Sequence, residues 1–159
     1  MKTSKLFLLA ALLCGIAAAA GSKPDFSGTW KLNYDKSTKD GPPDRVYICE
    51  IHQTGDSVTV STKATPAPEV VPLDGTFVAN GKIVVDKNQP HYHTVSAVWE
   101  GPTFVIEVYD KESKKELARV LSYIRESWVL SADGKTLTMF RRNAGNGKIV
   151  DEKYYFDKQ

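Results

Sequence analysis

The sequence has very little cysteine. Only Cys14 and Cys49 occur among 159 residues, and Cys14 lies in an N-terminal apolar run that we expect to be removed. A single remaining thiol cannot form an intrachain disulfide, so the fold must be stabilised by its own core. A domain of roughly 140 residues is large enough to bury such a core. Cys49 stands in a strand-like run, and we interpret it as a buried small apolar side chain rather than a reactive thiol.

An excess of charge of one sign is also missing. The chain has 21 basic and 19 acidic residues, and removal of Lys2 and Lys5 with the expected leader leaves 19 of each. A near-neutral domain with mixed signs has no electrostatic footprint for nucleic acid or for an anionic membrane. The composition therefore predicts no nucleic-acid partner.

Motifs of catalysis are absent as well. The sequence contains no nucleophile elbow, P-loop, dinucleotide fingerprint or HExxH helix, so we predict a protein that is not an enzyme and has no cofactor. Its three histidines include His91 and His93, which share one face of an extended segment. A zinc site needs three or four ligands. These two are therefore weak candidates for a metal site, and two surface histidines are the ordinary interpretation.

The first twenty residues have the pattern of a signal peptide. Lys2 and Lys5 form a positive start, residues 6–20 are small and apolar, and Ala18 and Ala20 give the A-x-A cleavage pattern. The apolar run is shorter than the roughly 20 residues that span a bilayer. We expect cleavage after Ala20, which leaves residues 21–159 as one exported domain, periplasmic or extracellular, with no membrane span.

The rest of the chain alternates with period two in short stretches separated by turns. In the strand-like run 45–53, Val46, Ile48 and Glu50 share one face and Tyr47, Cys49 and Ile51 share the other. Residues 117–130 are long enough for a helix, but their β-branched and aromatic residues favour one long or bent strand. Further strands are expected at 26–34, 57–61, 70–78, 82–86, 93–100, 103–109, 135–142 and 148–156. About ten short strands without a convincing helix predict an antiparallel sandwich or up-and-down barrel.

The opening strand narrows this choice. FSGTWKL at 26–32 resembles the first strand of fatty-acid-binding proteins and, through Gly-x-Trp, of lipocalins. The resemblance implies a calycin-like antiparallel barrel of about eight to ten strands. In such a barrel Gly28 lets the strand bend, and Trp30 plugs the closed end.

Later segments resemble the same family. They are the hairpin at 56–60, the pair Arg125-Glu126 followed by ADGKTLT at 132–138, and Lys153-x-Tyr155 in the place of the family's Arg-x-Tyr. The chain departs from the family in the segment 35–44, which is too short and too rich in helix breakers for the helical lid. The whole mature chain is most similar to exported bacterial proteins that begin DFSGTWKLN, a group with no assigned activity.

The resemblance suggests where a ligand would bind. Arg119, Arg125, Lys153 and Tyr155 are candidates for a group inside the barrel that orients the polar end of a ligand. The alternative is that Arg125 pairs with Glu126 or Glu107 on the outer surface. We predict a non-enzymatic barrel that binds a small apolar or amphipathic, lipid-like ligand. The competing prediction is an envelope protein with a packed core that acts through protein–protein contacts, and either version leaves the oligomeric state open.

Overall fold

The described part of the protein is almost entirely β-structure. The computed structural model describes residues 23–38, 46–65, 73–84, 94–109, 122–145 and 147–159. Its nine strands are β1 (Gly28–Asn33), β2 (Val46–Thr54), β3 (Ser57–Thr65), β4 (Gly75–Val78), β5 (Thr94–Glu100), β6 (Thr103–Tyr109), β7 (Ser122–Leu130), β8 (Thr136–Gly145) and β9 (Lys148–Lys158). A three-residue 3-10 helix, η1 (Tyr34–Lys36), follows β1.

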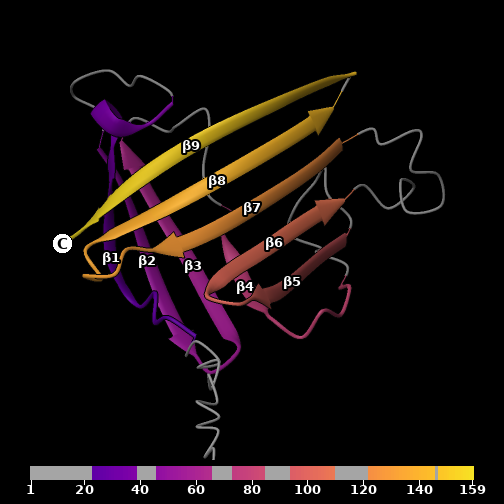
Figure 1. The fold of residues 1–159 in the computed structure, drawn as a ribbon, viewed down its shortest axis with the longest axis horizontal. Coiled ribbons are helices and arrows are strands. Elements are labelled where there is room, and N and C mark those ends of the chain that lie inside the picture. Colours follow the sequence, from indigo (N-terminus) through magenta and orange to yellow (C-terminus); the bar gives the residue numbers. More distant parts are fainter. Residues whose placement is uncertain (1–22, 39–45, 66–72, 85–93, 110–121, 146) are drawn as a thin grey trace, which may run out of the picture.

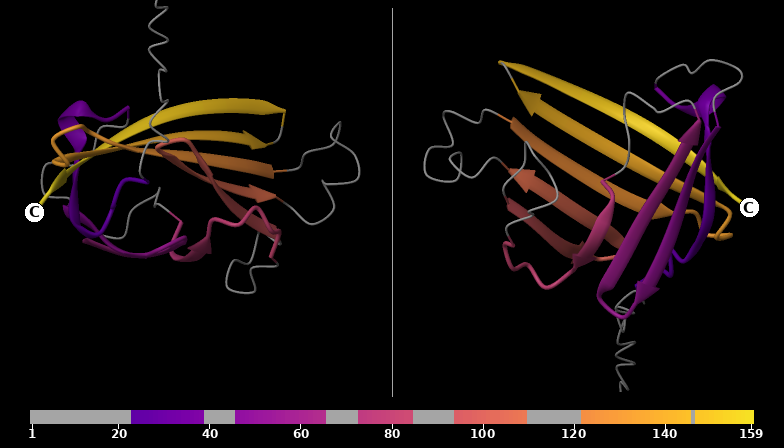
Figure 2. Two further views of the ribbon diagram at one scale, coloured as in Figure 1. Left: turned by 60° about the horizontal axis from the view of Figure 1, so that its bottom comes forward. Right: turned by 180° about the vertical axis from the view of Figure 1, so that it is seen from behind.

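All nine strands belong to one antiparallel sheet in the order β4-β3-β2-β1-β9-β8-β7-β6-β5. Neighbours in sequence are neighbours in the sheet, except that the first strand pairs with the last, Leu32 lying opposite Phe156. This pairing joins a wall of β1–β4 to a wall of β5–β9, and the strands of the two walls cross one another (Figures 1 and 2). The result is a nearly closed up-and-down barrel, as the sequence predicts.

Among the described residues, no strand ladder joins the two remaining edges, β4 and β5, and the place where they meet is called the seam below. The chain that follows β4 runs along β5 instead: the Gly81 amide donates to the Ala97 carbonyl at 3.0 Å. Val84 and Val95 exchange two backbone hydrogen bonds of 2.8 and 2.7 Å. The strand expected at 82–86 is therefore represented, within the described residues, by the single bridge at Val84.

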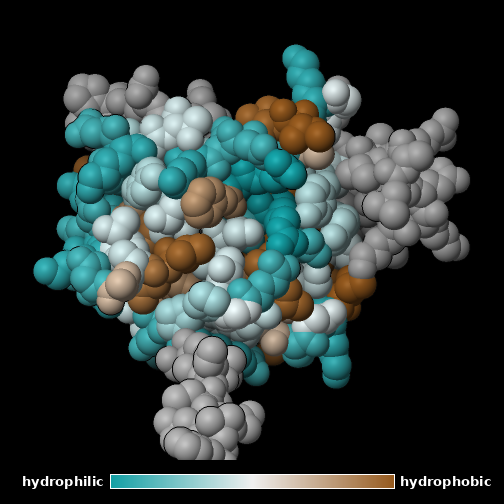
Figure 3. All heavy atoms as spheres, in the orientation of Figure 1, coloured by the Kyte–Doolittle hydropathy of each residue, from teal (hydrophilic) through white to brown (hydrophobic). Residues whose placement is uncertain are grey.

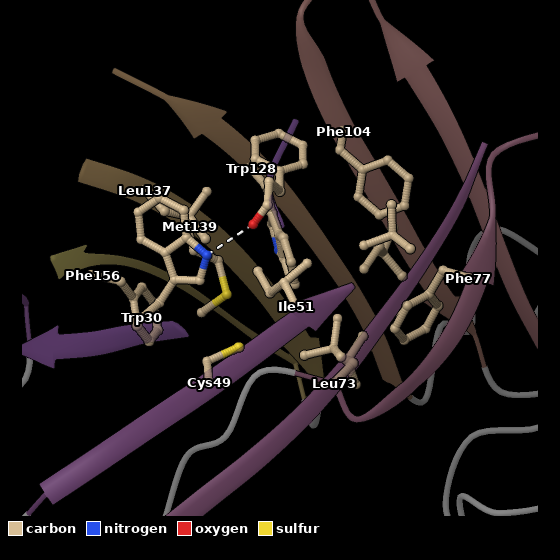
Figure 4. Close-up of a cluster of buried hydrophobic side chains, with 14 of the residues drawn as sticks. Trp30, Cys49, Ile51, Leu73, Phe77, Phe104, Trp128, Leu137, Met139 and Phe156 are labelled. Atoms are coloured by element: carbon tan, nitrogen blue, oxygen red, sulfur yellow. Dashed lines mark hydrogen bonds between the residues drawn. The ribbon is translucent and has the colours of Figure 1, made fainter. Parts of the chain in front are cut away.

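The barrel interior is packed with aromatic and aliphatic side chains. Phe26 and Trp30 are both 0% exposed, and the Trp30 indole N–H donates to the Phe26 carbonyl at 2.9 Å. The Phe26 ring also stacks on Trp99 and meets Trp128 edge-on. Figure 4 shows Trp30 beside Leu137, Met139 and Phe156, with Trp128 and Ile51 in the same cluster. An interior of this kind gives the sheet most of its stability.

The backbone conformation of Gly28 and its close neighbours both favour glycine at this position. Its φ of 143° lies in a region that side-chain-bearing residues rarely adopt. A Cβ placed there would lie 2.9 Å from Cε of Lys158, whose ammonium group sits 5.2 Å from the Trp30 ring. The glycine thus allows β1 to bend close to the end of β9. Whether Trp30 closes one end of the barrel stays a prediction.

Two further expectations concern the segment 117–130 and the leader. Residues 122–130 form strand β7, so the described part of the ambiguous segment is a strand and not a helix; residues 117–121 lie outside the described residues. The expected leader, residues 1–20, also lies outside them.

Candidate ligand-binding interior

Strands β7, β8 and β9 place a row of charges on the inner face of the barrel. In β7, Ile124 and Trp128 belong to the core, and because side chains alternate along a strand, Glu126 between them points the same way. Glu126 lies opposite Arg141 of β8, and Arg141 lies opposite Glu152 of β9. Exposures of 0%, 7% and 9% show that this acid–base–acid row, which we call the inner charged row, is shielded from water.

Arg141 is held tightly by the first of its two acidic neighbours. Its Nε donates to Oε1 of Glu126 at 2.9 Å, and a second guanidinium nitrogen donates to the same oxygen. The other oxygen of Glu126 accepts from the Trp128 indole N–H at 3.0 Å. Burial alone would lower the pKa of Arg141, but the charge of Glu126, assisted by that of Glu152, raises it. The guanidinium therefore stays charged in the interior.

Two tyrosine hydroxyls face the same interior. Tyr47 of β2 is 1% exposed and Tyr154 of β9 is 4% exposed, and neither hydroxyl meets a partner with hydrogen-bond geometry among the described residues. Burial raises the pKa of Tyr47, against smaller lowering effects of the neighbouring Thr62 side chain and of the Arg141 charge. Burial and then the adjacent Glu152 carboxylate raise the pKa of Tyr154. Both groups therefore remain protonated, and each can donate or accept a hydrogen bond.

A cavity of about 350 Å³ lies at the seam between β4 and β5. Phe77, Val95 and Ala97, all buried, contribute to its lining from the core side. Exposed residues such as Asp74, Asn80 and Lys82 line the rest of it. Ligand pockets in proteins have volumes of roughly 300–1,000 Å³ and apolar walls with a few polar groups. The seam cavity meets this description.

The site residues expected from sequence are distributed differently. Arg125, Lys153 and Tyr155 alternate with the buried residues of β7 and β9, so their side chains lie on the outer face rather than inside the barrel. Arg125 forms ion pairs there with Glu107 and Glu100. Glu107 is one of the two outer partners that the sequence offered as the alternative. A ligand-binding role for these three residues stays a prediction.

Three of the expected site residues, Arg119, His91 and His93, lie outside the described ranges. Lys153 itself lies over two aromatic rings, with its Nζ 4.7 Å from the ring centroid of Tyr155 and 5.0 Å from that of Phe140.

The inner charged row was not anticipated, although the sequence carries a signal for it. Ile124 and Trp128 are the apolar residues of IRESW, and the residue that shares their parity is Glu126 rather than Arg125. The resemblance to the family's Arg-x-Tyr pattern predicted Lys153 and Tyr155 as site residues. The side chains that point inward are those of Glu152 and Tyr154, one residue earlier in each case. A shift of one residue moves every side chain to the opposite face.

Within the described ranges, no three histidine, cysteine or acidic side chains cluster so that they could hold a metal ion. No helix in these ranges has the length and apolar character needed to cross a membrane.

Comparisons with known proteins give the fold. No protein-family model matches the chain, and no curated protein matches it in sequence. Among solved structures, a point mutant of the fluorescent protein UnaG is similar over 84% of this chain and 96% of its own, with a TM-score of 0.53 and 16% identity. Secretory abundant heat soluble protein 4 from Ramazzottius varieornatus is similar over 87% of this chain and 97% of its own, with a TM-score of 0.52 and 13% identity. Such low identities carry the architecture alone: the chain has the fold of the fatty-acid-binding-protein-like barrels.

Proposed function

We propose that this chain is an exported, non-enzymatic barrel that takes a small apolar or amphipathic ligand into its interior. The observation that carries the proposal is the cavity at the β4–β5 seam, where no ladder joins the described strands and buried Phe77, Val95 and Ala97 line an opening. A break in the wall of the barrel gives a small ligand a route toward the interior.

The polar groups of the interior support the same function. Leaving a hydroxyl buried without a partner costs roughly 1–3 kcal/mol, and the Tyr47 and Tyr154 hydroxyls both stand in this state among the described residues. A bound molecule with a polar end would supply the missing hydrogen bonds. Apolar walls with a few convergent polar groups are the usual composition of a small-molecule site.

Export rests on the sequence of residues 1–20. Expression of the complete chain, followed by mass measurement of the protein recovered from the cell envelope or the medium, tests this part. Cleavage after Ala20 gives a protein that begins at Gly21. An intact N-terminus on the recovered protein would contradict export by a cleaved leader.

The binding itself is tested with the processed protein. Native mass spectrometry shows whether a small molecule copurifies, and a neutral apolar fluorophore reports binding at the seam. Ala97→Leu places extra volume at the cavity wall and should weaken fluorophore binding by about tenfold or more, which corresponds to about 1.4 kcal/mol. Val98→Leu, on the opposite face of β5, is the matched control and should leave the affinity unchanged.

Circular dichroism of both variants checks that the barrel is intact. A wild-type protein that binds no fluorophore, or two folded variants with the same affinity as the wild type, would contradict binding at the seam.

The competing function, action through protein–protein contacts, is favoured by one observation. Ile149 and Val150, at the start of β9, are 70% and 48% exposed. A brown patch at the end of the β8–β9 hairpin is visible in Figure 3. If this patch is the functional surface, Ile149→Ser with Val150→Ser abolishes crosslinking to a partner in cells, whereas Ala97→Leu has no effect.

A further inference from the structure

We propose that the seam cavity binds a short peptide with free termini, about three residues long, which adds to the edge of β4 as an extended strand parallel to it. This inference rests on the proposed function and names its ligand class. It comes from the backbone groups that β4 turns toward the seam and from the charges at the two ends of the cavity.

The register of β3 and β4 shows which backbone groups of β4 face the seam. The Ala79 amide donates to the carbonyl of Asp56, in the turn before β3, at 2.8 Å, and the same ladder continues through Phe77. Because hydrogen-bonded and non-hydrogen-bonded pairs alternate in an antiparallel ladder, Phe77 and Ala79 both bond toward β3. Thr76 and Val78, which alternate with them, therefore direct their N–H and C=O groups away from β3 and toward the seam.

Three of these four groups are open. The Val78 carbonyl accepts from the Asn80 amide at 2.8 Å, whereas no backbone hydrogen bond among the described residues involves either group of Thr76 or the N–H of Val78. The β5 side differs, because the chain after β4 covers it where Val84 and Val95 exchange two hydrogen bonds. A strand whose edge carries open donors and acceptors is a template for a further strand.

A tripeptide parallel to β4 satisfies these three groups. In a parallel ladder, one residue bonds to the residues before and after the one that lies opposite it. With the central residue of the peptide opposite Thr76, the Thr76 N–H donates to the first carbonyl of the peptide, and the Thr76 carbonyl accepts from the third N–H. The Val78 N–H donates to the terminal carboxylate. Only a longer peptide would bring a donor to the Val78 carbonyl, which is the group already bonded.

The cavity also fits the side chains of such a peptide. Its first and third residues face the same way as Gly75 and Phe77, which is inward. Phe77, Val95 and Ala97 are buried and line the cavity, so apolar side chains suit these two positions. Gly75 leaves room beside the first residue, since a Cβ placed there would meet only the Phe77 ring, at 3.7 Å. The volume of about 350 Å³ lies near the lower end for ligand pockets, as expected for a few small residues.

Two charged side chains determine the direction of the peptide. Asp74 directly precedes β4, and Lys82 follows the turn after it. Both line the cavity, and neither forms an ion pair within the described ranges. A parallel peptide has its ammonium group near Asp74 and its carboxylate near Lys82. An antiparallel peptide would bring like charges together at both ends, which is unfavourable.

The experiment uses the processed wild-type protein and the tripeptide Val-Ala-Val, which should displace the neutral apolar fluorophore at neutral pH. A matched peptide carries a methyl group on the nitrogen of its third residue, which removes the donor to Thr76 and keeps all side chains and charges. It should bind about tenfold or more weakly, because a hydrogen bond is lost and the methyl group meets the strand. Acetylation and amidation of the termini should weaken binding by about threefold, and added salt should reduce this difference.

A pair of variants tests the same contact from the side of the protein. Thr76→Pro removes the N–H that faces the seam, and a strand edge tolerates proline where the N–H faces outward. Thr76→Val is the matched control: both variants lose the hydroxyl contact with Thr59 at 2.9 Å, but valine keeps the N–H. The proline variant should bind the tripeptide about tenfold or more weakly than the valine variant. Circular dichroism checks that both are folded, and the comparison of the two peptides does not depend on either variant.

The outcomes separate this inference from the function on which it rests. If neither the fluorophore nor the tripeptide binds, the proposed binding function itself is wrong. If the fluorophore binds but Val-Ala-Val does not displace it, or if the methylated peptide binds equally well, the barrel binds ligands and the inferred ligand class is wrong. Tighter binding of the blocked peptide would assign the edge to an internal segment of a longer chain. A dimer that Thr76→Pro dissociates would assign it to a second copy of this protein. Either result would overturn the inference.

Discussion

Two arginines of neighbouring strands, each set between two glutamates, lie on opposite faces of the same sheet. Arg125 on the outer face contacts Glu107 at 2.7 Å and both oxygens of Glu100 at 2.8 Å, and its side chain is 31% exposed. Arg141 on the inner face is paired with Glu126 and stands opposite Glu152, with its side chain 7% exposed. The residue types are the same, so the difference lies in the surroundings.

The comparison shows how strongly access to solvent changes the free-energy cost of a charged side chain. On the outer face, solvent compensates any imbalance, and the hydroxyls of Tyr109 and Tyr123 complete the shell of Glu107 at 2.8 and 3.2 Å. On the inner face every charge has to be compensated by protein or by ligand. The outer arrangement therefore contributes modestly to stability. The inner one is costly to keep unless each of its charges is paired.

The largest loss of stability is expected from Arg141→Met, which tests the difference between the inner and the outer arginine. The change leaves two carboxylates in the interior without the cation that faces them, and removal of one partner of a buried pair costs about 3–5 kcal/mol. Urea unfolding followed by tryptophan fluorescence should show a loss of this size. The cost should exceed that of any single substitution in the outer network.

A double variant serves as the control for this prediction. In Glu126→Gln with Arg141→Met the glutamine amide oxygen can still accept from Trp128, while one uncompensated charge is gone. The double variant should therefore be more stable than Arg141→Met alone. Two equal stabilities, or losses that add strictly to those of the two single variants, would mean that Glu126 and Arg141 are not coupled.

The outer arginine gives the next, smaller effect. Arg125→Met removes both outer ion pairs, and partly exposed pairs contribute about 0.2–1 kcal/mol each. Glu100 and Glu107 place the Arg125 pKa above its ordinary value, but solvent takes over much of their compensation when the arginine is removed. We expect a loss of about 1 kcal/mol that shrinks as salt is added, measured by the same urea titration. A loss as large as that of Arg141→Met would remove the distinction between the two faces.

Sequence reasoning reaches the sheet more easily than the site. The sequence placed Tyr47, Cys49 and Ile51 on one face of a strand, and all three are buried in the structure. Many such stretches and turns predicted an antiparallel sandwich or barrel, and the resemblance of residues 26–32 to fatty-acid-binding proteins and lipocalins favoured the barrel. The site depends on which residue of a neighbouring pair faces inward, as with Arg125 and Glu126. When both residues are charged, their types do not show which of the two side chains faces the core. Residues of the row also come together only through the pairing of β7, β8 and β9, which local sequence does not specify.

The smallest effect concerns reactivity rather than stability, and it compares the two faces within β2. Cys49 on the inner face is 2% exposed, and burial raises its pKa to about 12. At a pH of about 8 the thiolate fraction is then roughly a thousandfold below that of an ordinary exposed thiol, in addition to the loss of access. A disulfide reagent should leave Cys49 unmodified until urea unfolds the chain. In a Cys49→Ala background, Glu50→Cys places a thiol on the outer face, where it should react at once.

The raised pKa of Cys49 also predicts how the stability of the fold changes as the pH rises above neutrality. Its folded value of about 12 lies above the ordinary thiol value of 9.0, so the folded protein keeps a proton that the unfolded chain releases. This thiol therefore favours the folded state fully below about pH 9. Its contribution is lost as the pH rises from about 9 toward 12. Cys49→Ala should make the urea midpoint less sensitive to pH across that window than it is in the wild type. An unchanged slope, together with rapid labelling of the native protein, would place Cys49 in contact with solvent and would contradict the assignment of this face of β2 to the barrel interior.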